Sequence, residues 1–194
     1  MDWICENGGL AANQLNNLTV KGEFAELSEN NGEGFLETPI VETEKFKEIT
    51  PSWNSRTDKG SFVELFIRLR VEDKWTPYVS YGLWSTDGNN AGVGNYYKDE
   101  IIRATDDRIF VLNDKYGDAV QIKVVLKGKN PKLKLIAFST DAGEDEPVEG
   151  DYLRSLANVP LISQLASGHK DAHVICSPTS LTMALKYHGK NVEL

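Results

Sequence analysis

The chain has 194 residues, of which 40% are hydrophobic and 26% are charged, a composition typical of globular protein. Its formal net charge of −8, from 21 Lys and Arg against 29 Asp and Glu, argues against nucleic acid or an anionic membrane surface as a partner. No stretch approaches the roughly 18 apolar residues of a membrane span. The length allows one complete domain and part of another.

The first 140 residues are expected to be mainly β. Residues 61–71 and 119–126 alternate apolar with polar side chains, which predicts half-buried strands. Residues 133–137 alternate in the same way after a Gly-Lys-Asn-Pro turn, so the strands on either side of this turn are predicted to form a hairpin. Further strand candidates are 18–27, 34–41, 77–84 and 108–112. About seven or eight short strands without a convincing helix between them predict a jelly-roll-like β-sandwich over residues 1–140.

Tryptophan and tyrosine side chains are concentrated in and around residues 75–97, next to a loop rich in Asn and Gly. Two interpretations stay open, because aromatic side chains mostly build sandwich cores but can also stack on sugar faces. The second interpretation names four candidate ligand-binding residues, Tyr81, Trp84, Asn89 and Asn90.

Several aspartates also lie in predicted turns, where carboxylates typically satisfy backbone groups rather than bind calcium. They are Asp87, Asp106, Asp107, Asp114 and Asp118. The spacing of the two cysteines, Cys5 and Cys176, does not suggest a metal site, and both are predicted to be reduced. We predict no cofactor and no metal.

Residues 139–150 contain five acidic side chains and no basic one. A segment of this composition repels itself and cannot be buried, which is typical of a linker. We therefore place an acidic linker at 141–150, after the β-sandwich domain and before residues 151–194. That last segment is too short to build a core of its own.

The segment that starts at Cys176 has the features of a helix start. Ser177 is a favourable N-cap, Pro178 suits the first helical position, and Gly189 supplies a C-terminal end. Positions with helical spacing follow, namely Leu181, Ala184, Leu185 and His188. Cys176 would lie at the positive end of the helix dipole, which favours the nucleophilic thiolate. The alternative is a buried structural cysteine.

A second segment, residues 159–164, ends at Gln164, twelve positions before Cys176. Together with the Cys-Ser-Pro-Thr-Ser sequence at 176–180, it resembles the papain-like cysteine peptidases of the bacteriocin-processing, double-glycine leader peptidase type. The resemblance covers about residues 158–191 and implies that 151–194 is the N-terminal fragment of a papain-like α+β domain, including its first helix. It also implies that Cys176 is the nucleophile and that Gln164 donates a hydrogen bond to the oxyanion. Ser177 stands where the family commonly has Gly.

Such a peptidase also needs a histidine as general base and an Asp or Asn to orient it. The three histidines of the chain are His169, His173 and His188. His188 lies twelve positions along the same helix, about 18 Å from Cys176, so it cannot be the base. The family offers no counterpart for the other two. We therefore expect the chain to be the N-terminal part of a longer enzyme and to be inactive alone.

Two functions from different classes remain open. In the first, the parent protein is a bacterial cysteine peptidase that hydrolyses peptide bonds by thiolate acyl transfer, with a β-sandwich accessory domain. Its partners would be a peptide or protein substrate, and the remainder of the peptidase domain or another chain packed on 151–194. In the second, the chain is a non-catalytic β-sandwich that binds a glycan or a protein. No signal peptide is visible, and both a cytoplasmic and a secreted location stay open.

Overall fold

The computed structural model describes residues 1–28, 32–87, 97–143 and 159–193. It divides the chain into two compact units, Met1–Glu146 and Pro147–Leu194. Within the described residues, the first unit holds the strands and a 3₁₀ turn, η1 (Asn7–Ala12). The second unit holds the only described α-helix, α1 (Cys176–Tyr187).

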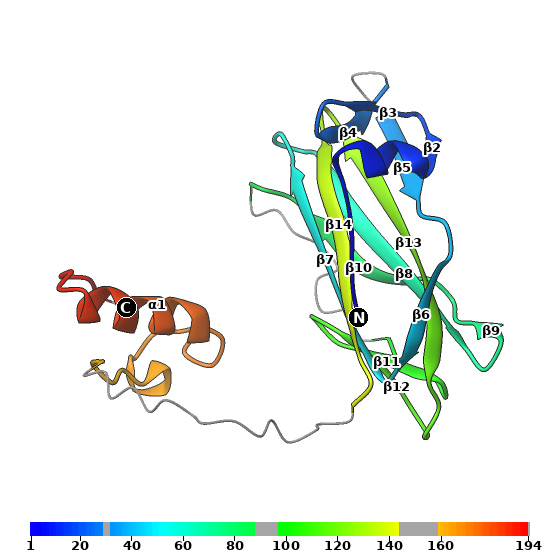
Figure 1. The fold of residues 1–194 in the computed structure, drawn as a ribbon. Helices are drawn as coiled ribbons and strands as arrows, with labels where there is room; N and C mark the ends of the chain where they lie inside the picture. The colour runs from blue at the N-terminus through cyan, green and yellow to red at the C-terminus, as the bar shows by residue number, and fades with distance from the viewer. Residues whose placement is uncertain (29–31, 88–96, 144–158, 194) are drawn as a thin grey trace. The chain divides into compact units, whose positions relative to one another are not determined.

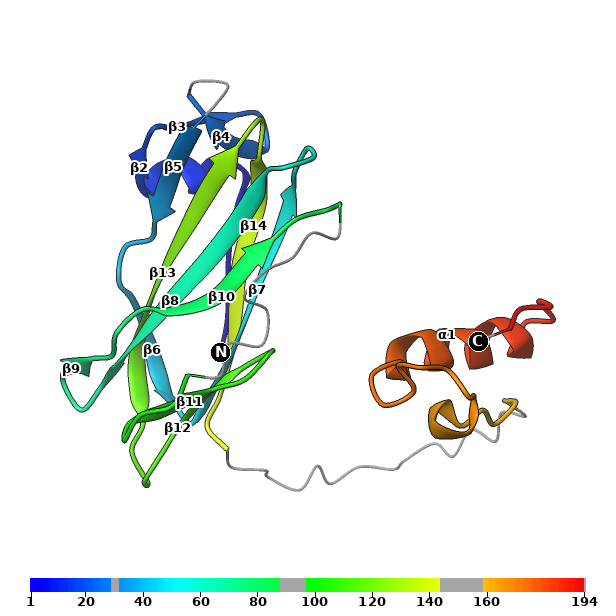
Figure 2. The same cartoon turned by 180° about the vertical axis from the view of Figure 1, so that it is seen from behind.

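The first unit is a sandwich of two antiparallel sheets (Figures 1 and 2). One seven-stranded sheet has the order β11 (Ile102–Ala104), β12 (Ile109–Val111), β7 (Glu48–Arg56), β14 (Lys132–Asp141), β4 (Phe24–Leu27), β3 (Leu18–Lys21), with β1 (Asp2–Glu6) also paired to β14. The other seven-stranded sheet has the order β10 (Val79–Trp84), β8 (Phe62–Val71), β13 (Gly117–Gly128), β5 (Gly32–Glu37), β2 (Gln14–Asn16), with β6 (Val41–Phe46) paired to β13 and β9 (Lys74–Trp75) paired to β8. The predicted mainly β fold, a β-sandwich followed by a helix, is confirmed.

The core lies between the two sheets, where apolar side chains from alternate strand positions meet. On β8, every second residue from Val63 to Val71 is buried, and on β13 the same holds from Val120 to Leu126. These two strands pair with each other over most of their length. Each large aliphatic side chain that is buried contributes about 1.5–3 kcal/mol to folding. The predicted half-buried strands at 61–71 and 119–126 are therefore confirmed.

The predicted hairpin around residues 128–131 is wrong. β13 and β14 belong to different sheets, so this turn joins the two layers instead of pairing its flanking strands. Gly128 has a φ of 99°, and the Ser61 hydroxyl fixes the turn by donating to the Lys129 carbonyl at 2.6 Å and accepting from the Lys129 N–H at 2.8 Å. Two alternating strands look the same in sequence whether the turn between them stays in one sheet or crosses to the other.

The buried face of β14 also differs from the alternation expected at 133–137. The pairing of β14 with β7 shifts register between Leu133 and Leu135. Because of this shift, Ile136 and Phe138 are buried, whereas Leu135 and Ala137 are only half-buried. A single bulge thus exchanges the inward and outward positions of the strand beyond it.

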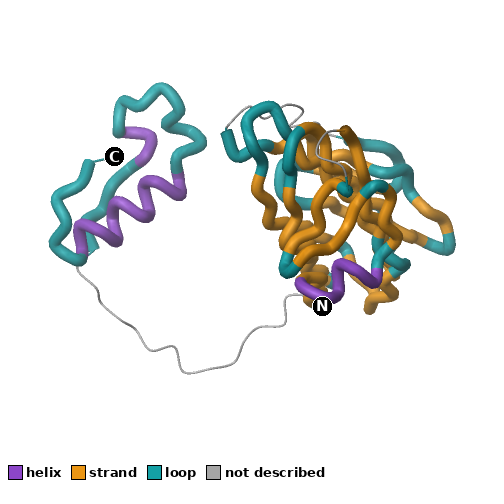
Figure 3. Tube along the Cα trace, turned by 90° about the horizontal axis from the view of Figure 1, so that it is seen from above, coloured by secondary structure: helices purple, strands orange, loops and turns teal. Residues whose placement is uncertain are grey.

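The second unit contains a 3₁₀ turn, η2 (Gln164–Ala166), followed by α1; both are purple in Figure 3. The buried side chains of α1 are Thr179 and Thr182. None of the helices that the structure describes is long and apolar enough to cross a membrane.

Candidate functional site

A groove opens where β7 of one sheet and β10 of the other meet. Its volume is about 340 Å³. Three aromatic side chains and two carboxylates contribute to its walls, namely Trp53, Tyr81, Trp84, Asp106 and Asp107. The structure therefore brings together two residues predicted to bind a ligand, Tyr81 and Trp84. It adds three that were not proposed for this role.

An irregularity in β10 positions Tyr81. The pairing of β10 with β8 shifts register between Ser80 and Leu83, and Gly82 has a φ of 78°. The Ser80 hydroxyl accepts a hydrogen bond from the Gly82 N–H at 2.9 Å, which holds the bulge closed. A β-bulge redirects the side chains beside it. Tyr81 here packs against the core and lies edge-on to Trp53, with 6.2 Å between the ring centroids.

The hydroxyl of Tyr81 is buried and has no hydrogen-bond partner in the described part of the chain. Burial raises the pKa of this hydroxyl above its ordinary value, and the nearby charge of Asp107 adds to the effect. An unpaired buried polar group costs about 1–3 kcal/mol. Most buried polar groups in folded proteins are paired, and among the described residues the hydroxyls of Thr19, Thr43 and Ser55 are unpaired in the same way.

The two carboxylates of the groove come from the turn between β11 and β12. Both Asp106 and Asp107 are exposed. Asp107 accepts a hydrogen bond from the Thr105 hydroxyl at 3.1 Å and pairs with Arg108 at 3.5 Å. Arg108 also pairs with Glu48 at 3.0 Å. The groove is therefore acidic, with part of its charge balanced by an arginine.

The other two predicted ligand-binding residues, Asn89 and Asn90, lie outside the described residues. Among the residues that are described, no group of three or more His, Cys, Asp or Glu side chains is placed to hold a metal ion.

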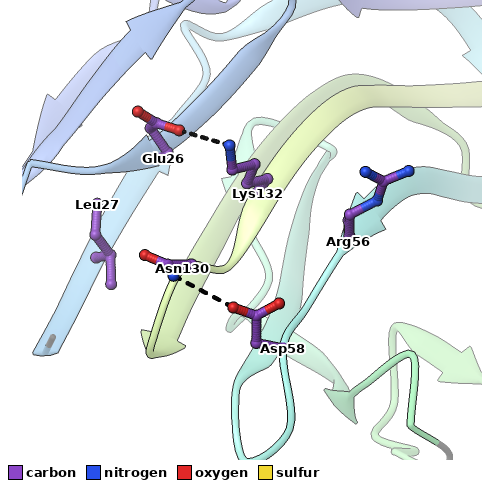
Figure 4. Close-up of a pocket in the computed structure, with 6 residues that line it drawn as sticks. All are labelled: Glu26, Leu27, Arg56, Asp58, Asn130 and Lys132. Carbon is purple, nitrogen blue, oxygen red and sulfur yellow. Dashed lines mark hydrogen bonds and ion pairs between the residues drawn. The ribbon is translucent and has the colours of Figure 1, made fainter. Parts of the chain in front are cut away.

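A second, charged cavity of about 450 Å³ lies beside β4 and the start of β14 (Figure 4). Two of its charges pair with each other, since Lys132 lies 3.1 Å from Glu26, and the neutral Asn130 amide donates to Asp58 at 3.2 Å. A hydrogen bond from Lys21, helped by Lys132, holds the pKa of Glu26 below its ordinary value. This cavity could not be predicted from the sequence, because its residues come from separate strands and turns and share no motif.

The candidate nucleophile, Cys176, is the first residue of α1, and its side chain is exposed. The N-cap is Ile175, so the predicted capping by Ser177 is wrong and the helix begins two residues earlier than expected. Thr179 stabilises this earlier start, because its N–H and its hydroxyl both donate to the Ile175 carbonyl, at 3.0 and 2.7 Å. The Cys176 N–H lies in the first turn, where helical N–H groups have no partner within the helix.

The predicted apolar stripe of α1 is largely uncovered within the second unit. Leu181 is 60% exposed, Ala184 and His188 are also exposed, and Leu185 is half-buried. Large apolar side chains elsewhere in this unit are exposed as well, namely Leu161, Leu165, Val174 and Tyr187. The unit therefore presents an apolar surface that its own described residues do not cover.

Gln164, the predicted oxyanion donor, begins η2 and is half-buried. Its carbonyl oxygen accepts a hydrogen bond from the Ser167 hydroxyl at 2.6 Å, which closes the turn. No hydrogen bond joins the side chains of Gln164 and Cys176 among the described residues. Both belong to the same compact unit.

No hydrogen bond joins a histidine to Cys176 among the described residues of the second unit. Nδ1 of His169 accepts a hydrogen bond from the Asp171 N–H at 3.1 Å, within their own turn. His188 is the C-cap of α1, at the opposite end of the helix from Cys176. His173 is exposed.

The two sheets and their shared core define the first unit as a β-sandwich domain. Residues 11–135 match the family described as the peptidase C39 N-terminal domain, and the chain belongs to this family. The matched range lies within the first unit and ends before Gln164 and Cys176. An association with a peptidase is thereby confirmed, while the papain-like character of residues 158–191 stays a prediction.

No curated protein matches the chain. Among solved structures, the chain is similar to TmCBM61 in complex with beta-1,4-galactotriose. The identity is 10%, the TM-score is 0.35, and the match covers 70% of this chain and 86% of that one.

Proposed function

We propose that the chain is the N-terminal part of a cysteine peptidase that hydrolyses peptide bonds by acyl transfer. The β-sandwich at 1–140 would be an accessory domain, followed by an acidic linker at 141–150 and by a papain-like fragment at 151–194. The observation that carries the proposal is the combination of a family match to a peptidase's N-terminal domain with an exposed thiol at the start of α1.

The proposed chemistry begins with Cys176. Its thiolate attacks the carbonyl carbon of the scissile bond, and the Gln164 amide and the Cys176 N–H donate hydrogen bonds to the oxyanion that forms. The general base has taken the thiol proton; collapse of this intermediate expels the amine, which takes that proton from it, and leaves a thioester. Water then hydrolyses the thioester and regenerates the thiol. The exposure of Cys176 supports this role, since a nucleophile must meet its substrate.

The general base in this proposal is a histidine outside the sequence given. The support comes from the described histidines, because His188 lies at the far end of α1 and His169 is engaged within its own turn. The exposed apolar side chains of the second unit support a covering partner, which we propose is the remainder of the peptidase domain. Leu181 on α1, 60% exposed, would be one of its contacts.

The proposal is tested by hydrolysis of an internally quenched peptide with a double-glycine site by the longer protein. Cys176→Ser should abolish turnover, whereas Cys5→Ser, which alters the buried thiol of the first unit, should retain it. Gln164→Ala should lower kcat by about 10²–10³-fold with little change in KM, because the lost hydrogen bond is made in the transition state. Full turnover by Cys176→Ser would rule the proposal out.

A second candidate function, ligand binding by the β-sandwich, is supported by the groove at Trp53, Tyr81 and Trp84. It concerns the first unit alone. Binding there and hydrolysis by the longer protein are therefore independent and can fail separately.

A further inference from the structure

We propose that the groove between β7 and β10 binds one ring of a neutral sugar. This inference rests on the proposed ligand-binding function and names the class of ligand. Three features of the groove lead to it: aromatic walls, an unpaired buried hydroxyl, and carboxylates at the β11–β12 turn.

The aromatic walls fit the apolar face of a sugar. Trp53 comes from one sheet and Tyr81 and Trp84 come from the other, so the walls meet across the sandwich rather than along one strand. All three side chains are half-buried, which leaves part of each available for contact. A groove of about 340 Å³ is large enough for a single hexose ring and at the lower end of small-molecule sites.

The polar groups of the groove fit sugar hydroxyls. The Tyr81 hydroxyl is enclosed and lacks a partner among the described residues, so a sugar hydroxyl reaches it only if the tyrosine side chain moves on binding, and could then both donate to it and accept from it. Asp106 and Asp107 offer carboxylate oxygens, which accept hydrogen bonds from hydroxyl donors. Charge-assisted bonds of this kind are stronger than those between neutral groups.

The charge of the groove selects a neutral ligand. The carboxylates of Asp106 and Asp107 repel an acidic sugar such as a uronate, and the net charge of −8 acts in the same direction. Aromatic walls with carboxylates could also receive an organic cation. Asp107 pairs with Arg108 at 3.5 Å, which weakens the attraction for a cation and the repulsion of an acidic sugar alike, so the titration includes a cationic probe as well as an acidic one.

The test is a titration of the 194-residue chain followed by tryptophan fluorescence and calorimetry. The probes are β-linked trisaccharides of glucose, galactose, mannose and N-acetylglucosamine, with trigalacturonate, tetramethylammonium and a hexaproline peptide as comparisons. We expect at least one neutral trisaccharide to bind and the other three probes not to bind.

Substitutions inside and outside the groove show whether the sugar binds there. Trp84→Ala should weaken it about tenfold. Trp75→Ala, which removes a tryptophan that stacks on Arg68 outside the groove, should leave it unchanged. Tyr81→Phe should weaken it about fivefold without lowering the free energy of unfolding, because it removes a hydroxyl that has no partner in the folded chain. If Tyr81 had only a structural role, Tyr81→Phe would not weaken sugar binding while leaving the free energy of unfolding unchanged.

Three results would overturn the inference in distinguishable ways. If trigalacturonate, tetramethylammonium or hexaproline binds at the groove and no neutral trisaccharide does, the groove is a binding site but the ligand class is wrong. If none of the probes binds, the ligand-binding function itself fails. If a trisaccharide binds equally well to Trp84→Ala and Tyr81→Phe, the sugar site lies elsewhere.

Discussion

Trp53 and Tyr81 belong to opposite sheets, yet their rings meet edge to face with 6.2 Å between centroids and an interplanar angle of 65°. This contact joins the two layers at the edge where the groove opens. It depends on the bulge in β10, because the register shift between Ser80 and Leu83 sets the direction of Tyr81. The geometry of the groove is therefore linked to the backbone conformation of one glycine, Gly82.

Replacing Gly82 with alanine is expected to destabilise the first unit by about 1–2 kcal/mol. The reason is that Gly82 has a φ of 78°, a region in which a Cβ meets the following carbonyl oxygen. Denaturant unfolding measures the loss, and near-UV circular dichroism should report a change around Trp53. Gly8→Ala is the matched control, since a Cβ there has no atom within 4 Å. Equal stability of both variants would contradict the proposed role of the bulge.

Gly117→Ala is expected to cost about 1–3 kcal/mol by overpacking. A Cβ at Gly117 would overlap the ring of Phe46, which is 1% exposed. Adding Phe46→Leu should recover part of the loss, so the double mutant should be more stable than the sum of the single effects predicts. Strict additivity in denaturant unfolding would show that the two positions do not compete for the same space.

Asp99 is expected to make stability depend on pH. Burial acts to raise the pKa of its carboxyl, but hydrogen bonds from the N–H groups of Ile102 and Ile101 and from the Tyr97 hydroxyl outweigh it and hold the pKa below the ordinary value of 3.8. The pKa of Asp99 is therefore lower in the folded state than in the unfolded state. The stabilisation is therefore fully present above the unfolded pKa and is lost as pH falls through the folded pKa.

The measurement is the unfolding free energy of the natural chain and of Asp99→Asn across acidic pH. The difference between them should be largest above about pH 4 and shrink on further acidification. A difference that stays constant down to about pH 2 would mean that the ionised carboxylate contributes nothing beyond the amide.

Local alternation was enough to predict β8 and β13, because both strands bury one face along most of their length. It missed β7, where Ile49, Pro51 and Trp53 alternate with polar residues but a proline in the middle of the segment argues against a strand. β7 is a strand because it pairs with β14 over its whole length, and that partner lies far away in the sequence. The hairpin error has the same cause, since the choice between one sheet and two is made by distant partners.

The candidate site residues could likewise be predicted only where they lie close together in the sequence. Tyr81 and Trp84 could be proposed because they lie close together in an aromatic-rich stretch of sequence. Trp53 and the aspartates at 106–107 join them only because β7, β10 and the β11–β12 turn meet at one groove. Cys176 could be proposed because its signal is local, a cysteine in a motif at a helix start.

The most direct test of the proposed peptidase function is inactivation of the longer protein by iodoacetamide, with the modified cysteines mapped by mass spectrometry. Cys176 is exposed, whereas Cys5 is 7% exposed and accepts a hydrogen bond from the Asn13 amide at 3.4 Å. Loss of hydrolysis should follow alkylation of Cys176 in equal proportion while Cys5 stays unmodified. Full hydrolytic activity after complete alkylation of Cys176 would contradict the account.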